Sequence, residues 1–394
     1  MSDSGHALPV LPYGTQSIDD ADIEAVVQVL RGRWLTTGPA VEAFEAALSR
    51  LGGARHAVAV SSGTAALHAL YAATGLAPGD ELITSPLTFV ATASAAILQG
   101  GTVKFADVDA TTGNIEARSA AGLVTPRTKA LVAVDYAGHP AEYDVLRTLA
   151  RERDLILLAD GAHAFGATYR GRPVGSLADA TTLSFHPVKT VTTGEGGAVL
   201  TDNDDYADRA RRFRNHGIVR GPQARTRSEG IAATAYATTW YYEVQSLGLN
   251  YRIPDILCAL GLSQLERLDA FLARRRALAA RYRQALGDLP GLEQPSVASH
   301  VSSAWHLYVV RVRERARRDA FFTRLRSMGL GVQVHYLPVY LHPVFAALGY
   351  RAGACPVAED FAARAVSLPL YPALTDADAD RVIDAVQTAH RAVL

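Results

Sequence analysis

Lys189 stands out among the residues that could do chemistry, because the sequence places it in a loop between two apolar, strand-like runs. It lies in the segment LSFHPVKTVTTGEGGAVLTD, residues 183–202, beside Ser184, His186 and a glycine-rich turn. A lysine that only keeps a surface soluble needs no such setting. The pattern therefore raises the question whether this amine acts as a nucleophile, and the remaining polar residues must answer it.

A group of small polar residues opens a predicted helix directly after a predicted strand. The run SSGTAALHAL, residues 61–70, follows the strand-like HAVAV. Backbone N–H groups and hydroxyls at the start of a helix form an anion site. The same residues are also common helix caps, so both interpretations stay open at this point.

Three further side chains lie near the ends of predicted strands. Phe89 follows DELITS, and Asp160 and His163 follow LILLAD. Taken alone, Phe89 is typical of a core aromatic and Asp160 of a cap or turn residue. Ligands of open α/β sheets collect beyond the carboxyl ends of the strands, which favours a site near Asp160.

Together these residues match the requirements of pyridoxal 5'-phosphate. The helix start would hold its phosphate, Lys189 would form a Schiff base, and Asp160 would keep the pyridine nitrogen protonated so that the ring withdraws electrons. Phe89 and His163 would fix the plane and the phenolic oxygen of the ring. The sequence thus predicts Lys189 and Asp160 as catalytic residues of a cofactor enzyme.

The elements that must position these residues form an α/β pattern between residues 55 and 200. Short apolar runs alternate with longer helical patterns, as in a domain with a mainly parallel sheet. Gly75 and Gly100 mark two helix ends. We expect strands at 56–60, 80–85, 102–108, 129–138 and 155–160, and helices at 64–75, 89–100 and 142–154.

The pattern changes after residue 250. Residues 250–290 predict one or two long helices, and the arginines of ARRRALAARYR, residues 273–283, are expected to face solvent. Beyond Pro290, strands at 304–312 and 329–339 and a helix at 314–329 indicate a smaller α+β domain. We predict two domains, 1–260 and 261–394, and a mobile polar loop at 220–239.

Composition excludes several classes of partner. The 394 residues contain 39 Lys+Arg and 39 Asp+Glu, so no basic excess argues for nucleic acid or an anionic membrane. Cys258 and Cys355 lack metal-ligand or CxxC spacing, which favours buried free thiols and a reducing compartment. No secretory leader and no run of eighteen apolar residues is evident. We expect a cytoplasmic protein with small-molecule substrates and no metal.

The motifs SSGTAALHAL, TFVAT, DGAHAFGA, SFHPVKTVTTGEGGAVLTD, GLNYRIPDILCALGLSQL, HYLPV and SLPLYPALT resemble, in order, those of the DegT/DnrJ/EryC1/StrS family of nucleotide-sugar aminotransferases. The resemblance runs from LPYGTQSID almost to the C-terminus. It implies an α/β protein of PLP-dependent transferase fold type I, similar to aspartate aminotransferase. Two segments, SFHPVKTVTTGEGG and WYYEVQSLGLNYR, resemble the enzymes that aminate C4 of UDP-linked 4-keto-6-deoxy-N-acetylhexosamines in pseudaminic acid biosynthesis.

The resemblance also assigns roles to individual residues. Besides Lys189 and Asp160, it implies cofactor contacts by His163, Phe89, Gly63, Thr64, Ala65, Ser184 and Asn250. Asn250 would reach the phosphate of the other subunit, which implies a homodimer with shared active sites. Substrate contacts are implied for Tyr13, Thr36, His186, Arg252, His335 and Tyr336. For His186 a loop-stabilising hydrogen bond stays as open as a substrate contact, whereas a satisfied, partly buried histidine is the default interpretation of His335.

The implied reaction is a transamination with L-glutamate as donor. Lys189 would move the proton of the donor, the cofactor would pass through its pyridoxamine 5'-phosphate form, and the 4-keto sugar would receive the amine. Alternatives are a C3 or C4 aminotransferase on a dTDP-keto-sugar, another pyridoxal-dependent activity such as a lyase, or a non-catalytic PLP-binding regulator. Family relatives that dehydrate C3 carry histidine in place of the lysine, so Lys189 argues against that reaction.

Overall fold

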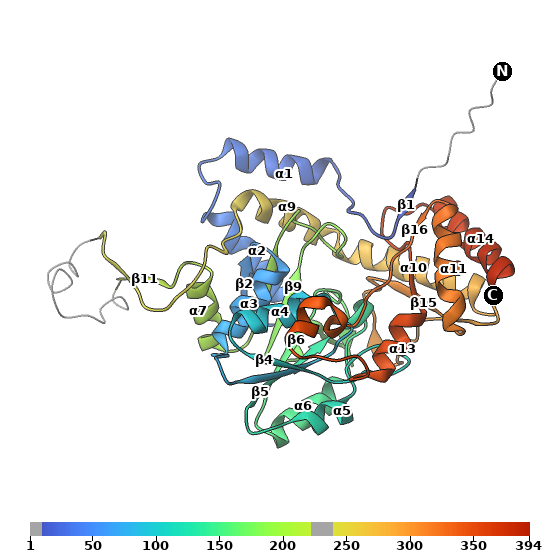
Figure 1. Ribbon diagram of the computed structural model, residues 1–394. Coiled ribbons are helices and arrows are strands. Elements are labelled where there is room, and N and C mark those ends of the chain that lie inside the picture. Colours follow the sequence, from blue (N-terminus) through green and yellow to red (C-terminus); the bar gives the residue numbers. More distant parts are fainter. Residues whose placement is uncertain (1–9, 222–238) are drawn as a thin grey trace.

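The computed structural model describes residues 10–221 and 239–394, and its centre is a seven-stranded sheet (Figure 1). The strand order is β2-β10-β9-β6-β5-β3-β4. Only β10 runs antiparallel to its neighbours, and the other pairings are parallel. The strands are β2 (His56–Val60), β3 (Glu81–Thr84), β4 (Thr102–Phe105), β5 (Thr128–Val134), β6 (Ile156–Asp160), β9 (Ala180–Ser184) and β10 (Gly197–Thr201). The predicted α/β class with a mainly parallel sheet is confirmed.

Alternating side chains of the strands build a core on each face of the sheet. In β2, Ala57 and Ala59 face one core, whereas Val58 and Val60 face the other. This period of two follows from the pleat of a strand. Because both faces are covered by helices, the strands are buried throughout, as parallel sheets require.

The helices divide between the two faces. One core contains residues of α2 (Pro39–Gly52), α5 (Ala117–Leu123), α6 (Tyr143–Glu152) and α9 (Asp255–Glu266). The other contains residues of α3 (Gly63–Ala73), α4 (Ala91–Leu98), α7 (Asp204–Phe213), α12 (Pro343–Ala347) and α13 (Pro356–Arg364). An outer helix, α1 (Asp20–Arg31), lies along α9 (Figure 1). Gly75 and Gly100 have positive φ just after α3 and α4, as expected for helix ends.

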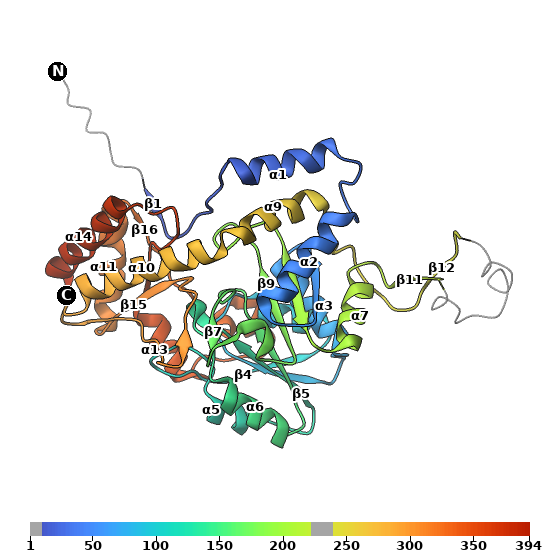
Figure 2. The ribbon, with the colours of Figure 1, turned by 180° about the vertical axis from the view of Figure 1, so that it is seen from behind.

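The C-terminal part has its own small sheet and core. Strands β13 (Leu292–Glu293), β15 (Tyr308–Val312) and β17 (Ala365–Leu368) pack with α11 (Arg315–Ser327) and α14 (Asp376–Val393). The long α10 (Leu268–Leu286) runs from the large sheet to this part (Figure 2). Three short strands, β7 (Thr168–Tyr169), β8 (Arg172–Pro173) and β14 (Val301–Ser302), form a further sheet.

The start of the described chain does not follow the predicted division into 1–260 and 261–394. Strand β1 (Leu11–Pro12) pairs with β16 (Leu330–Gly331), and Leu11 packs in the C-terminal core. Residue 260 also lies inside α9, a helix that packs in one of the two cores of the large sheet. The chain therefore threads its N-terminal segment back to the smaller part, a long-range pairing that local sequence patterns do not indicate.

Two other expectations need correction or fall outside the described residues. The strand expected at 329–339 is reduced to β16 plus one bridge, Gln333 with Ser367. Most of the loop expected at 220–239 is residues 222–238, outside the described part. Its flanks form the hairpin of β11 (Ile218–Arg220) and β12 (Tyr242–Val244), which extends away from the body (Figure 1). No helix among the described residues is long and apolar enough to cross a membrane.

Candidate active site

Lys189 lies in the loop between β9 and β10, as the sequence predicts. The loop folds back on itself through backbone hydrogen bonds, with Phe185 N donating to Gly196 O at 2.9 Å and Lys189 N donating to His186 O at 2.9 Å. The His186 side chain is exposed. These bonds therefore fix the main chain of Lys189, and they do not involve its amine.

Lys189 differs from every other lysine in its surroundings. The chain contains only three lysines. Lys104 forms an ion pair with Glu81 at 2.9 Å and Lys129 one with Asp80 at 3.1 Å, near the starts of the parallel strands. Lys189 has no such partner among the described acids, and it lies beyond the opposite ends of the strands. Lys189 is therefore the lysine whose amine is free to react.

The surroundings of Lys189 favour a neutral amine. The residue as a whole is half-buried. Burial lowers the pKa of Lys189 to about 8; the charge of Asp160 opposes this change and that of Arg275 adds to it. A lysine with such a pKa is a reactive nucleophile and base near neutral pH, as a Schiff-base lysine must be.

Asp160 ends β6 and is buried, with an exposed fraction of 6%. Its Oδ2 accepts a hydrogen bond from Thr92 Oγ1 at 2.6 Å, and its Oδ1 accepts one from Ala162 N at 3.1 Å. Burial raises the pKa of Asp160, whereas these two hydrogen bonds and the charge of Lys189 lower it. A cationic ring nitrogen beside this carboxyl would favour its ionised form further.

A second buried carboxyl lies beside Asp160. Asp135 follows β5, and its backbone N–H donates to Asp160 O at 3.1 Å. Its Oδ1 accepts from Ala141 N and from Tyr143 Oη, both at 2.9 Å, whereas Oδ2 has no partner among the described residues. Burial raises the pKa of Asp135 to about 7, and the neighbouring Asp160 adds to the increase. Sequence reasoning missed this residue.

His163 lies between two aromatic neighbours. Its Nε2 is 3.1 Å from Tyr336 Oη, and its ring is 4.2 Å from the ring of His306. Burial raises the pKa of Tyr336, so its hydroxyl keeps its proton and can donate to Nε2. The proton of the neutral imidazole then lies on Nδ1, a buried atom without a partner among the described residues. This atom can donate to a ligand oxygen.

The interpretation of Phe89 as a core aromatic is wrong, because 59% of the residue is exposed. Its ring centroid lies 6.5 Å from that of Tyr336, at the edge of the same group of side chains. Thr92, one turn further on, is the residue that donates to Asp160. A large exposed aromatic next to a buried carboxyl is suited to stack on a flat ligand.

The start of α3 closes the site on the side of β9. A Cβ atom at Gly63 would lie 2.9 Å from Ser184 Cβ, so glycine permits the close approach of helix and strand. Ser62 caps the helix, because its Oγ accepts from Ala65 N at 3.1 Å. The segment therefore acts as a helix cap and can also serve as an anion site, although the Ala65 N–H already donates to Ser62 Oγ. Thr64 is exposed and Ser184 is half-buried.

Three of the substrate residues suggested by resemblance also lie here. The Tyr13 and His335 rings are 4.9 Å apart, and Tyr336 contacts His163. His335 is buried, and its Nδ1 is 2.8 Å from Ser367 Oγ, so the satisfied-histidine interpretation holds for this atom. Burial lowers the pKa of His335 to about 4, with a further contribution from Lys189. The histidine is therefore neutral.

Thr36, Arg252 and Asn250 are associated with a different surface from Lys189. Arg252 lines a cleft of about 780 Å³ together with Thr37, next to the exposed Thr36. The Arg252 side chain donates to Asn215 Oδ1 at 2.7 Å. The exposed Asn250 pairs with the same Asn215 through an isolated antiparallel β-bridge of the backbone. Lys189 does not line this cleft. The predicted site residues thus fall into two groups within one chain.

Arg275 corrects the prediction that the arginines of α10 face solvent. It is fully buried, and burial lowers its pKa to about 10. Its position in the apolar stripe of the helix, three residues before Leu278 and seven before Tyr282, was a signal that sequence reasoning could have used.

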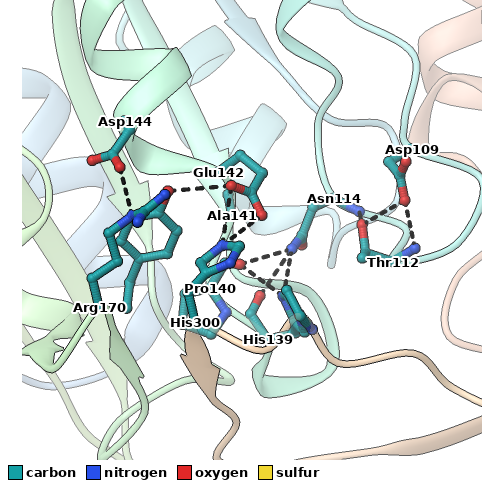
Figure 3. Close-up of polar contacts among 12 residues, drawn as sticks. Asp109, Thr112, Asn114, His139, Pro140, Ala141, Glu142, Asp144, Arg170 and His300 are labelled. Atoms are coloured by element: carbon teal, nitrogen blue, oxygen red, sulfur yellow. Dashed lines mark hydrogen bonds and ion pairs between the residues drawn. The ribbon is translucent and has the colours of Figure 1, made fainter.

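A further polar cluster supports the loop after β5 (Figure 3). Asn114 Nδ2 donates to the backbone oxygens of His139 and Pro140, and its Oδ1 accepts from Tyr136 N. His300 Nε2 lies 3.0 Å from Glu142 Oε1. The polar groups of this cluster thus find hydrogen-bond partners within the cluster, which fixes the loop. Among the described residues, no group of three His, Cys, Asp or Glu side chains could hold a metal ion.

The residues around Lys189 fit pyridoxal 5'-phosphate. Lys189, with its lowered pKa, suits a Schiff base, and the buried carboxyl of Asp160 suits the ring nitrogen. His163 Nδ1, which has no partner among the described residues, suits the phenolic oxygen, and the exposed Phe89 suits the face of the ring. The helix start with Gly63 and Ser184 supplies the expected phosphate position.

Comparisons with known proteins agree with this geometry. The model of the DegT/DnrJ/EryC1/StrS aminotransferase family matches residues 16–387. The spore coat polysaccharide biosynthesis protein SpsC of Bacillus subtilis (strain 168) is 42% identical over 382 residues, which cover 96% of this chain and 96% of SpsC.

Solved structures are similar over nearly the whole chain. PseC of Helicobacter pylori, an aminotransferase involved in the biosynthesis of pseudoaminic acid, has a TM-score of 0.88 and 31% identity, covering 97% of this chain and 100% of PseC. The putative sugar aminotransferase Spr1654 from Streptococcus pneumoniae, in its PMP form, has a TM-score of 0.90 and 29% identity, covering 97% of this chain and 100% of its own. Spr1654 is also solved in a PLP form.

Proposed function

Because the chain belongs to the DegT/DnrJ/EryC1/StrS aminotransferase family, we propose that it transfers the amino group of L-glutamate to C4 of a UDP-linked 4-keto-6-deoxy-N-acetylhexosamine. The chain is a PLP-dependent sugar aminotransferase of fold type I. The likeness to PseC over 97% of the chain is the observation that carries the choice of sugar, in a route of the pseudaminic acid type.

Lys189 is the residue to which we assign both proton transfers. When bound, pyridoxal 5'-phosphate supplies the electron sink that stabilises charge on the reacting carbon. With a pKa of about 8, the Lys189 amine can take the proton from Cα of glutamate and later deliver one to C4 of the sugar.

The other residues hold the cofactor in place. Asp160, supported by Thr92, would pair with the ring nitrogen, and His163 Nδ1 would donate to the phenolic oxygen. Phe89 would cover the ring, and the helix start at Gly63 and Thr64 with Ser184 would bind the phosphate. Tyr13, His335 and Tyr336 lie where an acceptor sugar could contact them.

An assay of product position tests the proposed substrate. The purified enzyme, loaded with cofactor, is given L-glutamate and a panel of UDP- and dTDP-linked keto-sugars, and the products are analysed by NMR. We expect amination at C4 of the UDP-linked 4-keto-6-deoxy-N-acetylhexosamine. Preferential turnover of a dTDP-linked sugar, or an amine at C3, would replace the proposed acceptor while keeping the aminotransferase activity.

We further propose that the enzyme is a homodimer in which Thr36, Asn250 and Arg252 complete the site of the other subunit. Two observations support this proposal. Arg252 and Thr37, the neighbour of Thr36, line a cleft that Lys189 does not line, and Asn250 is exposed. A two-fold dimer would exchange such residues through a self-complementary interface.

A mixed dimer tests the sharing. One chain carries Lys189→Ala and the other carries Asn250→Trp, which should block the phosphate position. If sites are shared, one site of each heterodimer carries both defects and the other carries neither. Activity should then reappear when the two nearly inactive homodimers exchange subunits. Proven exchange without recovery, or a fully active monomer in sedimentation, would contradict the shared site.

We also propose the cytoplasm as the location of the enzyme and small molecules as its only substrates. Both cysteines, Cys258 and Cys355, are buried and free, which suits a reducing compartment. Recovery of the protein in the soluble, reducing fraction of its native cells would test the location.

A further inference from the structure

Arg275 is a buried charge without a carboxylate partner. Its exposed fraction is 0%, and it forms no ion pair with any acid in the described part of the chain. Its Nη1 lies 2.9 Å from Leu370 O, 3.2 Å from Trp305 O and 3.3 Å from His306 O. Nε and Nη2 have no hydrogen-bond partner there. The guanidinium thus bridges three carbonyl oxygens and keeps its full positive charge.

Such a residue is costly for stability alone. Removing an ion from water without an opposite charge costs several kcal/mol, and a buried apolar side chain of similar volume would avoid that cost. The neighbouring positions of the same stripe, Phe271, Leu278 and Tyr282, show that apolar packing is available at this face of α10. The charge at residue 275 therefore calls for another explanation.

The three carbonyl groups belong to two loops that border the candidate active site. The His306 ring contacts the His163 ring in a tilted arrangement, with 4.2 Å between their centroids, and the backbone N–H of Leu370 donates to Tyr13 O at 3.0 Å. Tyr13 in turn contacts His335. One side chain on α10 therefore anchors both the loop behind His163 and the segment that carries Tyr13.

Arg275 also acts on the site through its charge. The Lys189 amine interacts electrostatically with Asp160 from β6 and Arg275 from α10, and its own charge acts on three histidines, His163, His306 and His335. Burial holds the pKa of each histidine below its ordinary value, and neighbouring positive charges add to this effect. In the described part of the chain, the negative charge of Asp160 raises the pKa of Lys189, and the permanent positive charge of Arg275 lowers it.

We propose that Arg275 is a positioning residue of the amino-transfer site, which fixes the His306 loop behind His163 and the Leu370 segment that holds Tyr13, and which adds an unpaired positive charge to this part of the site. This inference rests on the proposed role of Lys189. It goes beyond that role because it assigns a function to a residue that touches neither substrate nor cofactor. Two effects follow, one on geometry and one on the proton affinity of the lysine.

The test measures how fast full-length enzyme, freed of cofactor, captures added pyridoxal 5'-phosphate at different pH values, followed by the absorbance of the lysine-bound form. Only the neutral amine reacts, so the wild-type rate should rise with a midpoint near pH 8. Arg275→Met removes the charge and should move this midpoint upward by about half a unit to one unit. Arg275→Lys keeps the charge and should leave the midpoint unchanged.

Turnover separates the geometric effect. The ammonium of Arg275→Lys has three donors, but lysine is one bond too short to bring it to the position of Nη1, which contacts all three carbonyl oxygens. Its kcat should therefore fall roughly tenfold or more while its pH midpoint stays. The matched control is Arg281→Met on the same helix, which loses surface ion pairs with Asp376 and Asp380 and should match the parent in both measurements.

An unchanged midpoint in a folded Arg275→Met variant, or a parental kcat in Arg275→Lys, would overturn the proposal. If Arg275→Met does not fold, Arg275→Lys still decides, because a parental kcat refutes the positioning role and a lowered kcat at an unchanged midpoint supports it. Lysine-bound cofactor in Lys189→Ala would instead mean that the proposed role of Lys189 is wrong, whatever the Arg275 variants do.

Discussion

Replacement of Asp135 by asparagine should make the protein more stable at alkaline pH than the parent. The carboxyl of Asp135 is fully buried beside Asp160, one of its oxygens has no partner in the described structure, and burial raises its pKa from 3.8 to about 7. Asparagine keeps the oxygen that accepts from Ala141 N and Tyr143 Oη but cannot ionise.

The sign and size of the effect follow from proton linkage. Below pH 3.8 the carboxyl is protonated in both the folded and the unfolded chain and has no effect. Between pH 3.8 and about 7 only the unfolded chain loses the proton, so stability falls as the pH rises, and above pH 7 the loss is complete. At about 1.4 kcal/mol per pH unit, the penalty grows by about 2 to 3 kcal/mol between pH 5 and pH 8.

Urea unfolding of parent and variant at pH 5 and pH 8, at one protein concentration, measures this difference. The free energy of unfolding of Asp135→Asn relative to the parent should increase by about 2 to 3 kcal/mol from the lower to the higher pH. Asp319→Asn, at an exposed carboxyl, serves as control and should show a change below about 0.5 kcal/mol. A constant difference between parent and Asp135→Asn at both pH values would refute the reasoning.

Three further variants test the residues of the site. Lys189→Ala should lose several powers of ten in kcat, and transamination within tenfold of the parent would show that another residue carries the reaction. Asp160→Asn should fold, because Thr92 and Ala162 can still hydrogen-bond its side chain, but it should lose kcat since an amide forms no ion pair with the ring nitrogen; a near-normal kcat would contradict this role. Phe89→Ala should weaken cofactor binding by about 1 kcal/mol with little change in the melting temperature, because the ring is largely exposed, whereas strong destabilisation would indicate a core residue.

Much of the frame of the site follows from local sequence patterns. Strand periodicity and helix-ending glycines predict β2, α3, β6 and the loop that carries Lys189, because each signal lies within a few residues of the feature it describes. The position of Asp160 at the end of β6 follows in the same way. These residues could therefore be grouped before any three-dimensional information.

The remaining features depend on contacts between distant segments. The pairing of β1 with β16 and the return of Tyr13 to His335 join residues more than 300 positions apart. Phe89 is exposed although hydrophobicity alone favours burial, and Arg275 is buried although charge favours exposure. Phe89 lies beside Tyr336 and Arg275 contacts His306, and both of these partners neighbour His163. Local rules fail most often at such functional sites.

Chemical trapping of the bound cofactor tests most directly that Lys189 is the residue that binds it. The loaded enzyme is treated with borohydride, which fixes the cofactor permanently to its lysine, and the digested protein is analysed by mass spectrometry. With only three lysines in the chain, the assignment is unambiguous. We predict the mass of the reduced cofactor on the peptide that contains Lys189 and unmodified peptides for Lys104 and Lys129. A label on either of those two lysines, or release of all cofactor after reduction, would contradict the central role of Lys189.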